Sequence, residues 1–521
     1  MMKQMRKEQQ LSNYLKRKVM NKKFYWLAGF AALMMTAACS DDNVTNPNPD
    51  PTPDPETEEN VVTLQVLDGA SQADRIQMVV PTKAVGGVKK NRLNYVATIK
   101  NPKAQAADRV WSTTSIYIEN EENTEHTVYI TWHSDRQATN PAQVWGGQLD
   151  VVGFNETGDN TSTIDIESSV LAQNVMKFEN VMKVDDVTFY NPNGEVVAGN
   201  NWGLFLSATH ATKGAVVARI PGFGMSRAEI LGMPGTSVNA VAELDGELIA
   251  VTGYNGTYAT FDPSAKSASY SYEHPERNTW LTLGQELTAG FGGKYVTTYN
   301  GEAYILHTDA EKAQIIKASD NSVVVDNMKP LLSDDKFSES YDPVTGDWFV
   351  NENGASTPTQ GKHVMVIKDG YAYVGAGLNG LRVYNLANGQ EVAQDDFEDG
   401  GPNTTGLCID DDLLYAATGS GLRVYSMLDG GKLSLYAFEV AEYDENGLPN
   451  SDDVPTTGVE EGEPILDEDG NVQQPRHSAN YVAVLTTTTA GDKYIFVAYG
   501  QSGVRVYKLI PNVGDNVGGI E

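Results

Sequence analysis

The 521-residue chain contains only two cysteines, Cys39 and Cys408. If Cys39 serves as a lipid attachment site, no intramolecular disulfide can form, and the folded domain depends on its apolar core. Basic residues are also scarce, because 38 Lys and Arg stand against 69 Asp and Glu, a formal charge of -31. Proteins bind nucleic-acid phosphates through Lys and Arg, so this balance excludes a nucleic-acid partner.

The apolar stretch from Phe24 to Met35 is too short to span a bilayer. It follows Lys22 and Lys23 and leads into the small residues Thr36, Ala37 and Ala38. This order is typical of a signal peptide, which we assign to residues 1–38. The charged residues 1–19 add nothing to such a signal, so translation is expected to begin at Met20.

The residues Thr36, Ala37, Ala38 and Cys39 resemble a bacterial lipobox, with Thr where Leu is commonest. The resemblance implies cleavage before Cys39 and attachment of fatty acyl chains such as palmitate, which anchor the protein to a membrane. The following Ser40, Asp41 and Asp42 resemble the acidic tag that sends lipoproteins to the outer face of the outer membrane in some Gram-negative anaerobes. We therefore expect a lipoprotein facing the cell exterior, with the periplasmic face as the alternative; an ordinary secretory signal with a chance cysteine is the competing interpretation.

Residues 39–60 contain five prolines and several acids, with no aliphatic residue after Val44. Proline and like charges keep a chain extended, so this segment is predicted to be a disordered tether between the lipidated cysteine and the folded domain.

An internal repeat marks the body of the chain. The sequence GLRVY occurs at 380–384 and 421–425 and returns as GVRVY at 503–507. The first spacing is that of one four-stranded propeller blade, and the second, which is doubled, fits a blade with an insertion. Each copy follows a turn and a strand that ends in Gly.

The same turn and strand recur upstream with less similarity, at Asn193-Gly194, Asp245-Gly246 and Asn300-Gly301, and in a degenerate form at 124–132. We predict an all-β fold, a β-propeller of seven four-stranded blades, with six or eight as alternatives. A propeller closes when a strand from one terminus completes the blade begun by the other. VVTLQVL at 61–67 is the predicted closing strand, beside Tyr494 or Val506.

The unit YAYVGAGLNGLRVYNL resembles the LVIVD-repeat family of bacterial β-propellers over about 361–510. The resemblance implies a ring of four-stranded blades, usually without an assigned activity. The predicted organisation is a closing strand and irregular segment at 61–111, a propeller at 112–510 with insertions near 319–360 and 439–477, and a tail at 511–521. Residues 68–110 are left without a placement.

Catalytic motifs are not evident. Gly375, Gly377 and Gly380 match a dinucleotide fingerprint, but the third Gly leads into a strand and not a helix. Gly293-Lys294 lacks the rest of a phosphate-binding loop. Cys408 is interpreted as a small buried hydrophobe, and the seven scattered histidines show no helical metal-binding spacing. No catalytic residue, metal ligand or cofactor is predicted, and the sequence does not decide whether a divalent cation binds.

Recurring arginines, Arg382, Arg423 and Arg505, are interpreted as structural partners of a neighbouring blade's carboxylate and not as an anion-binding ring. Trp145 and Trp202 lie in Gly- and Asn-rich contexts typical of loops, and they are the candidate binding residues, with burial as the alternative.

These observations favour a surface lipoprotein whose propeller is a binding or interaction module. The expected partners are an outer-membrane transporter that receives a nutrient, a glycan, or a surface protein. A hydrolase or lyase acting on an extracellular polymer, and a scaffold in an envelope complex, are the alternatives.

Overall fold

The computed structural model describes residues 61–67, 76–78, 93–100, 109–119, 124–136, 145–157, 161–172 and, with short gaps, 176–265, 281–331, 339–341, 348–350, 363–395, 404–438 and 479–509. Apart from Arg136 they belong to one compact unit, 60–135 with 145–521. Within them the elements are strands, with two short 3-10 helices, η4 (Asp429–Gly431) and η6 (Gly500–Ser502). The described residues contain no helix that is both long and apolar enough to cross a membrane.

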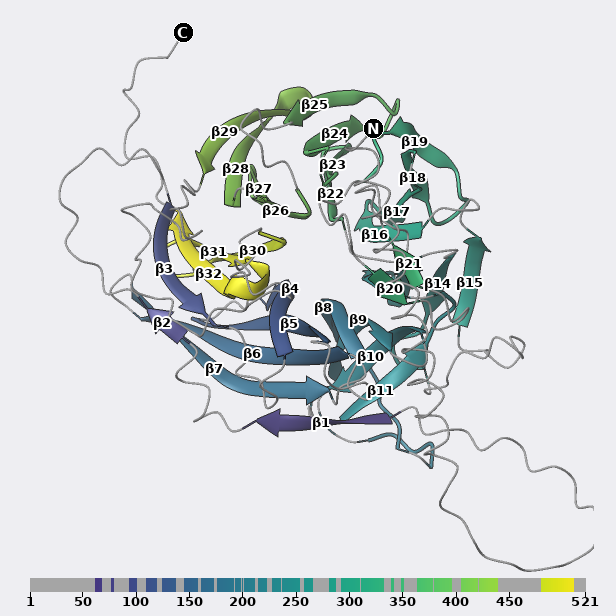
Figure 1. Cartoon of the computed structure of the whole chain (residues 1–521), viewed down its shortest axis with the longest axis vertical. Helices are drawn as coiled ribbons and strands as arrows, with labels where there is room; N and C mark the ends of the chain where they lie inside the picture. Colours follow the sequence, from purple (N-terminus) through teal and green to yellow (C-terminus); the bar gives the residue numbers. More distant parts are fainter. Residues whose placement is uncertain are drawn as a thin grey trace, which may run out of the picture. The chain divides into compact units, whose positions relative to one another are not determined.

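Seven four-stranded antiparallel blades surround a central axis, which confirms the predicted propeller (Figure 1). From the axis outward, blades 1 to 3 are β4 (Arg109–Glu119), β5 (Glu125–Arg136), β6 (Trp145–Thr157) and β7 (Thr161–Ala172); β8 (Met176–Asp185), β9 (Trp202–His210), β10 (Gly214–Pro221) and β11 (Arg227–Gly232); and β12 (Val238–Leu244), β13 (Glu247–Thr252), β14 (Thr257–Phe261) and β15 (Leu281–Glu286).

Blades 4 to 6 continue in the same order, each strand pairing with the next. They are β16 (Gly292–Tyr299), β17 (Glu302–Thr308), β18 (Ala313–Lys317) and β19 (Val323–Met328); β22 (Met365–Lys368), β23 (Tyr371–Gly375), β24 (Leu381–Asn385) and β25 (Glu391–Asp395); and β26 (Gly406–Asp410), β27 (Leu413–Thr418), β28 (Gly421–Leu428) and β29 (Lys432–Phe438). Blade 7 combines β30 (Tyr481–Thr486), β31 (Lys493–Ala498) and β32 (Val504–Leu509) with β3 (Leu93–Ile99), and β2 (Ile76–Met78) lies outside β3.

The hydrophobic core is divided among the blade interfaces. Each of seven apolar clusters combines residues of two adjacent blades, including one cluster that joins blade 7 to blade 1. The innermost strands of successive blades also contact one another, and β30 contacts β4. Strands in the ring are therefore buried on both faces, which explains the nearly continuous apolar sequences of β9 and β10.

The ring is closed by β3, which pairs with β32 so that Ala97 lies opposite Val506. The prediction that 61–67 closes it is therefore wrong, and part of the unplaced 68–110 segment performs this task. The physical reason is connection length: β3 directly precedes β4 in the chain, and blades 7 and 1 are neighbours, so a short link joins the closing strand to blade 1.

Strand β1 (Val61–Leu67) instead lies at the outer rim. Its first half pairs with β11, where Val61 faces Glu229, and its second half pairs with β7, where Leu64 faces Ala172. This one strand joins blades 1 and 2 into a nine-stranded sheet and covers both of their outer edges.

Tight turns join the inner strand to the second strand at the places that the sequence indicated. Asp245, Asn300 and Asp369 each have φ near +50° and are followed by a Gly with positive φ; Asp411 has the same conformation before Asp412. Two consecutive positive φ values form the type I′ turn, which Asn-Gly and Asp-Gly favour.

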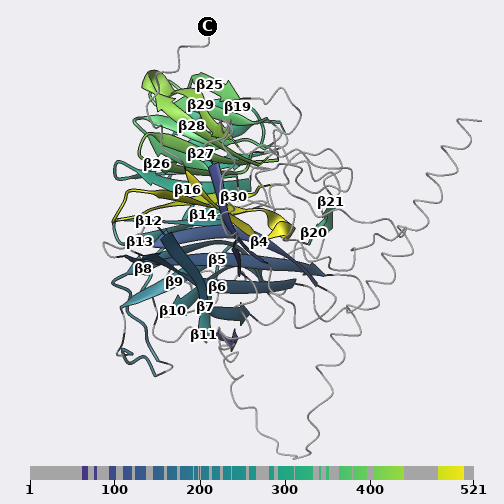
Figure 2. The same ribbon diagram turned by 90° about the vertical axis from the view of Figure 1, so that its left-hand side faces the viewer.

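Two other predictions need correction. Asn193-Gly194 does not start the second strand of blade 2, because Val196 forms only an isolated bridge with Tyr190 and the strand begins at Trp202. The predicted insertion at 319–360 begins too early, because β19 is a strand of blade 4 and lies within these bounds. The inserted segment follows β19 and includes a hairpin of β20 (Glu339–Tyr341) and β21 (Trp348–Val350). Figure 2 shows this hairpin on one side of the blades. Residues 439–477 lie outside the described residues.

Candidate functional site

Side chains from four blades meet at the axis of the ring. The Tyr295 phenol, from β16 in blade 4, shares hydrogen bonds with Tyr481 of blade 7 and with Asn180 of blade 2. The ionised form of Cys408 in blade 6 would raise the pKa of both phenols, which places the thiol near them. Because nonadjacent blades approach one another only at the axis, these four residues, the axial cluster, lie across the centre of the ring.

Burial governs the acidity of the axial cluster. It raises the pKa of Tyr295 and of Tyr481, and it raises the pKa of the Cys408 thiol to about 12. All three residues are nevertheless only partly buried. The cluster therefore offers neutral hydroxyl, thiol and amide groups, because the raised pKa keeps the Cys408 thiol protonated at pH 7. Cys408 was interpreted as a small buried hydrophobe, but the residue is only partly buried.

Three neighbouring inner strands carry a β-bulge beside this cluster. The register shifts between Phe178 and Asn180 in β8, between Val238 and Ala240 in β12, and between Gly293 and Tyr295 in β16. The extra residues are Glu179, Asn239 and Lys294. A bulge re-aims side chains and is common near functional sites, so three polar bulge residues in a row distinguish blades 2 to 4.

Lys294 is fully buried beside the charge of Glu179. Burial lowers its pKa to about 7 against the opposing effect of Glu179. The neighbouring His363 is buried as well, and burial together with the Lys294 charge lowers its pKa to about 3. His363 is thus neutral at pH 7, with Nδ1 2.9 Å from the Gly375 carbonyl oxygen. Asn239 donates its amide to the Gly293 carbonyl oxygen at 2.6 Å.

The buried amine of Lys294 predicts a pH dependence of stability. Its pKa is about 7 in the folded chain against an ordinary value of 10.5, so the unfolded chain binds one more proton between these two pH values. The free energy of unfolding should rise with pH by about 1.4 kcal/mol per unit in this window, relative to Lys294→Met. Urea unfolding of both proteins from pH 7 to 10 measures the difference. If the difference in the free energy of unfolding between the parent and Lys294→Met does not change with pH, Lys294 does not have the lowered pKa. Lys432→Met, at an exposed position, is the control.

The Tyr295 hydroxyl should contribute to stability through its bonds across the axis. Tyr295→Phe removes them and is expected to lower the free energy of unfolding by about 2 kcal/mol. Tyr499 is the matched control, because its hydroxyl is buried without a hydrogen-bond partner in the described structure. In thermal unfolding, the midpoint temperature of Tyr499→Phe should equal or exceed that of the parent. Equal decreases for Tyr295→Phe and Tyr499→Phe would contradict a hydrogen-bonded axial cluster.

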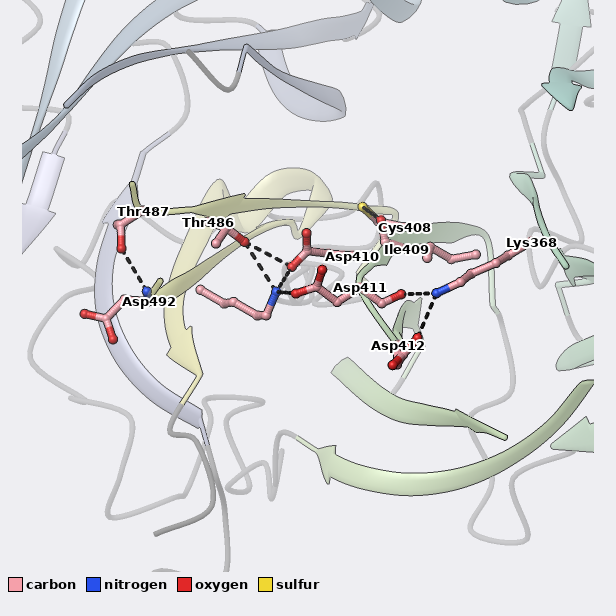
Figure 3. A network of polar contacts seen from close by, with 10 residues as sticks. Lys368, Cys408, Ile409, Asp410, Asp411, Asp412, Thr486, Thr487 and Asp492 are labelled. Atoms are coloured by element: carbon pink, nitrogen blue, oxygen red, sulfur yellow. Dashed lines mark hydrogen bonds and ion pairs between the residues drawn. The ribbon is translucent and has the colours of Figure 1, made fainter. Parts of the chain in front are cut away.

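A second polar network joins blades 5 to 7 at their inner turns (Figure 3). Lys493 of β31 contacts Asp410 and lies 2.7 Å from Asp411 Oδ2. On the other side, Lys368 of β22 donates to the Asp411 carbonyl oxygen and, at 3.0 Å, to Asp412. The three consecutive aspartates are thus held by lysines of both neighbouring blades, which indicates a structural role for them.

The sequence-predicted site residues have different positions. The lipidation residue Cys39 and the tag Ser40, Asp41 and Asp42 lie outside the described residues. Trp145 and Trp202 do not lie in loops, because each begins a strand, β6 and β9. Both Trp-Gly sequences are compatible with extended pairing, and the neighbouring glycines misled the prediction of loops.

Trp202 is half-buried, and its contacts are structural. Lys183 Nζ lies 5.1 Å from the centre of its ring, and a Cβ at Gly222 would collide with the indole. The indole ring of Trp202 thus packs against Gly222 on one side, and the Lys183 ammonium group makes a cation–π contact with it. The side chain of Trp145 lies outside the described residues. Binding by either tryptophan stays a prediction.

The recurring arginines make three different contacts. Arg382 lies 3.0 Å from Glu391 in its own blade, and Arg423 lies 3.8 Å from Asp395 in the neighbouring blade. Arg505 stacks over Tyr499 at 4.3 Å. A structural role is supported for each, and the pair of Arg423 with Asp395 is the contact with a neighbouring blade's carboxylate that the sequence predicted. The described residues contain no group of three His, Cys, Asp or Glu residues that could hold a metal ion.

No family model and no curated protein matches the chain. Among solved structures it is similar to the WD40 β-propeller domain of Doa1, with a TM-score of 0.39 and 11% identity over 80% of this chain and 97% of that one. The C-terminal WD40 domain of Sif2 gives a TM-score of 0.38 and 10% identity over 78% and 97%. The computationally designed protein Ika8 gives 0.35 and 11% over 77% and 97%. The fold assignment rests on the strand pairing, and no function is transferred from these structures.

Proposed function

We propose that this protein is a surface-exposed outer-membrane lipoprotein, related to the LVIVD-repeat propellers, whose propeller is a binding module. The observation that carries the binding role is the axial cluster. It assembles two phenols, a carboxamide and a thiol from four blades, near the buried Lys294 and the partly exposed Glu179. Such groups serve as hydrogen-bond donors and acceptors for a ligand's hydroxyl or amide groups.

The ligand class that fits this cluster is a hydroxyl-rich molecule such as an oligosaccharide. Its partly exposed tyrosines combine an apolar ring with a hydroxyl, as sugars require. The carboxylate of Glu179, also partly exposed, can accept hydrogen bonds from ligand hydroxyls. Capture of such a nutrient for an outer-membrane transporter is the role that we propose.

The position of β1 supports presentation of the ring to ligands. Val61 pairs with Glu229 of the outermost strand β11, so the chain enters the propeller at its rim. In the proposed arrangement the tether joins the propeller at the outer rim of blade 2 and not at the axial cluster. From Cys39 to Val61 an extended chain reaches about 70 Å at roughly 3.3 Å per residue.

The proposed lipid anchor and cell-surface location are tested by comparing Cys39→Ser with the parent in cells. We expect the parent to incorporate labelled palmitate, to fractionate with outer membranes and to be degraded by protease added to intact cells. Cys39→Ser should incorporate no label and should not fractionate with membranes. Replacing Asp41 and Asp42 with Ala should retain the lipid but protect the protein from external protease. A parent protein that incorporates no palmitate, or that external protease does not degrade in intact cells, contradicts the proposed anchor and location.

A further inference from the structure

The backbone that carries Tyr295 is held in place by polar groups of blade 3. Tyr295 directly follows Lys294, the extra residue of the β-bulge in β16. Asn239 of β12 is 1% exposed and donates through Nδ2 to the carbonyl oxygen of Gly293, at 2.6 Å. Ser237 donates to Asn239 Oδ1 at 2.9 Å and so fixes the orientation of this amide. The position of the Tyr295 phenol is therefore set before a ligand binds, as in a preorganised site.

The amide of Asn180 donates to Tyr295. The backbone N–H of Val181 donates to Asn180 Oδ1 at 2.9 Å, which turns the oxygen of the amide towards its own strand. Burial raises the pKa of Tyr295, and the hydrogen bond with Asn180 opposes this rise. A hydrogen bond lowers the pKa of a phenol when its donor stabilises the phenolate, so the Asn180 Nδ2 group is the donor. The Tyr295 oxygen is thus an acceptor on the side of blade 2.

The hydrogen bond with Tyr481 also ends on the Tyr295 oxygen. Burial raises the pKa of both phenols, whereas the bond between them lowers the pKa of Tyr295 and raises that of Tyr481. These opposite effects show that Tyr481 donates and Tyr295 accepts. Two donors occupy the two lone pairs of the Tyr295 oxygen, which leaves the proton of its own hydroxyl. In the described part of the chain Tyr295 makes no third hydrogen bond, and the residue is only partly buried.

We propose that Tyr295 is the specificity-determining residue of the axial cluster and donates its hydroxyl proton to the carbonyl oxygen of an acetamido sugar. This inference rests on the proposed saccharide-binding function and names the class of sugar. A carbonyl oxygen accepts and does not donate, so it matches a phenol whose lone pairs are both engaged. Glu179, beside Asn180 in the bulge of β8 and partly exposed, can accept the N–H of the same acetamido group. Its carboxylate disfavours an anionic acceptor such as a sugar carboxylate.

The probes are two oligosaccharides of equal length and linkage, one of N-acetylglucosamine and one of glucose. Both are neutral, and they differ at one ring carbon, which carries an acetamido group or a hydroxyl. Calorimetric titration of the purified full-length protein should show at least about tenfold tighter binding of the acetamido oligomer, which corresponds to about 1.4 kcal/mol. Tyr295→Phe should remove this preference. The infrared stretch of an isotope-labelled acetamido carbonyl should move to lower frequency on binding to the parent, and not on binding to Tyr295→Phe.

Asn180→Asp tests the direction of the proton while the Tyr295 phenol is retained. The new carboxylate has no N–H group and should accept the Tyr295 proton, so the preference should fall as it does in Tyr295→Phe. Tyr499→Phe changes a buried phenol outside the axial cluster and should keep the preference. Equal affinities for the two oligomers in the parent, or a preference that survives Tyr295→Phe, overturn the inference and leave saccharide binding intact. Absence of binding by both oligomers overturns the inference and contradicts the proposed saccharide role as well.

Discussion

Replacing Arg219 with Met should destabilise the protein by about 3–5 kcal/mol. Arg219 in β10 is buried, with its Nε 2.9 Å from Glu229 Oε2 and a second contact through Nη2. Its Nη1 donates to the carbonyl oxygens of Pro263 and Ala265, at 2.6 and 2.8 Å, in the connection that follows β14. One guanidinium therefore neutralises a buried carboxylate and ties blade 2 to blade 3. Its removal leaves the Glu229 charge buried without compensation.

The measurement is urea unfolding of the single and double variants. Arg219→Met combined with Glu229→Leu should recover most of the loss, because apolar replacement of both partners removes the uncompensated charge. About 1–2 kcal/mol should remain, since the carbonyl oxygens of Pro263 and Ala265 still lack their donor. A single variant within about 1 kcal/mol of the parent, or a double variant as unstable as the single, contradicts this account.

Loss of the Glu156 carboxylate should also destabilise the protein strongly, by about 2–4 kcal/mol for Glu156→Ala. Glu156, near the end of β6 in blade 1, accepts hydrogen bonds from the backbone amides of Thr488 and Thr489 in blade 7, at 2.7 and 3.0 Å. His126 Nε2 lies 2.7 Å from the same carboxylate. The side chain is 3% exposed. This contact reinforces the interface at which the ring closes.

The same carboxylate predicts an acid dependence. Burial alone would raise its pKa, but hydrogen bonds from Thr489, His126 and Thr488 outweigh burial and lower the pKa from 4.5 to about 2. The stabilisation is complete above pH 4.5 and is lost as pH falls towards 2. Glu156→Gln, which keeps one acceptor oxygen but no charge, should be less destabilising than Glu156→Ala and should lack this pH-dependent contribution. Parallel acid-unfolding curves for the parent and Glu156→Gln would refute the prediction.

Much of the fold could be predicted because propeller blades repeat their local chemistry. GLRVY identified the third strand of blades 5 and 6, and its GVRVY variant that of blade 7, while Asp-Gly and Asn-Gly marked the inner turns where φ is positive. Blade 2 was misassigned at Asn193-Gly194, because a turn-forming dipeptide in its long loop has the same local signature as a hairpin turn.

The closing strand could not be chosen from pattern alone. VVTLQVL and LNYVATI both satisfy strand propensity, and only the position of blade 7 next to blade 1 selects the second. The position of β1 at the rim could not be predicted from local sequence either. β1 pairs with the outer strands of two different blades, and such pairing depends on how the two blades lie together.

The axial cluster was missed because its members are far apart in sequence and come from different blades. Tyr295 and Tyr481 look like ordinary strand residues, and Lys294 was considered only as part of an incomplete phosphate-binding loop. The one available signal was a charged or amide side chain in the apolar inner strands β8, β12 and β16. That signal becomes meaningful only when the β-bulges place Glu179, Asn239 and Lys294 in neighbouring blades.

The central claim, that the propeller binds a ligand at the axial cluster, is tested most directly by thermal unfolding of the purified full-length protein against glycans, cobamides, haem, siderophores and metals with chelator controls. A ligand at a hundred times its dissociation constant adds about 2.7 kcal/mol to the free energy of unfolding. We predict an upward shift with an oligosaccharide in the parent and in the Tyr499→Phe control, and a smaller or absent shift in Tyr481→Phe and Glu179→Gln. Equal shifts in all four proteins, or no shift with any compound, would contradict an axial ligand site.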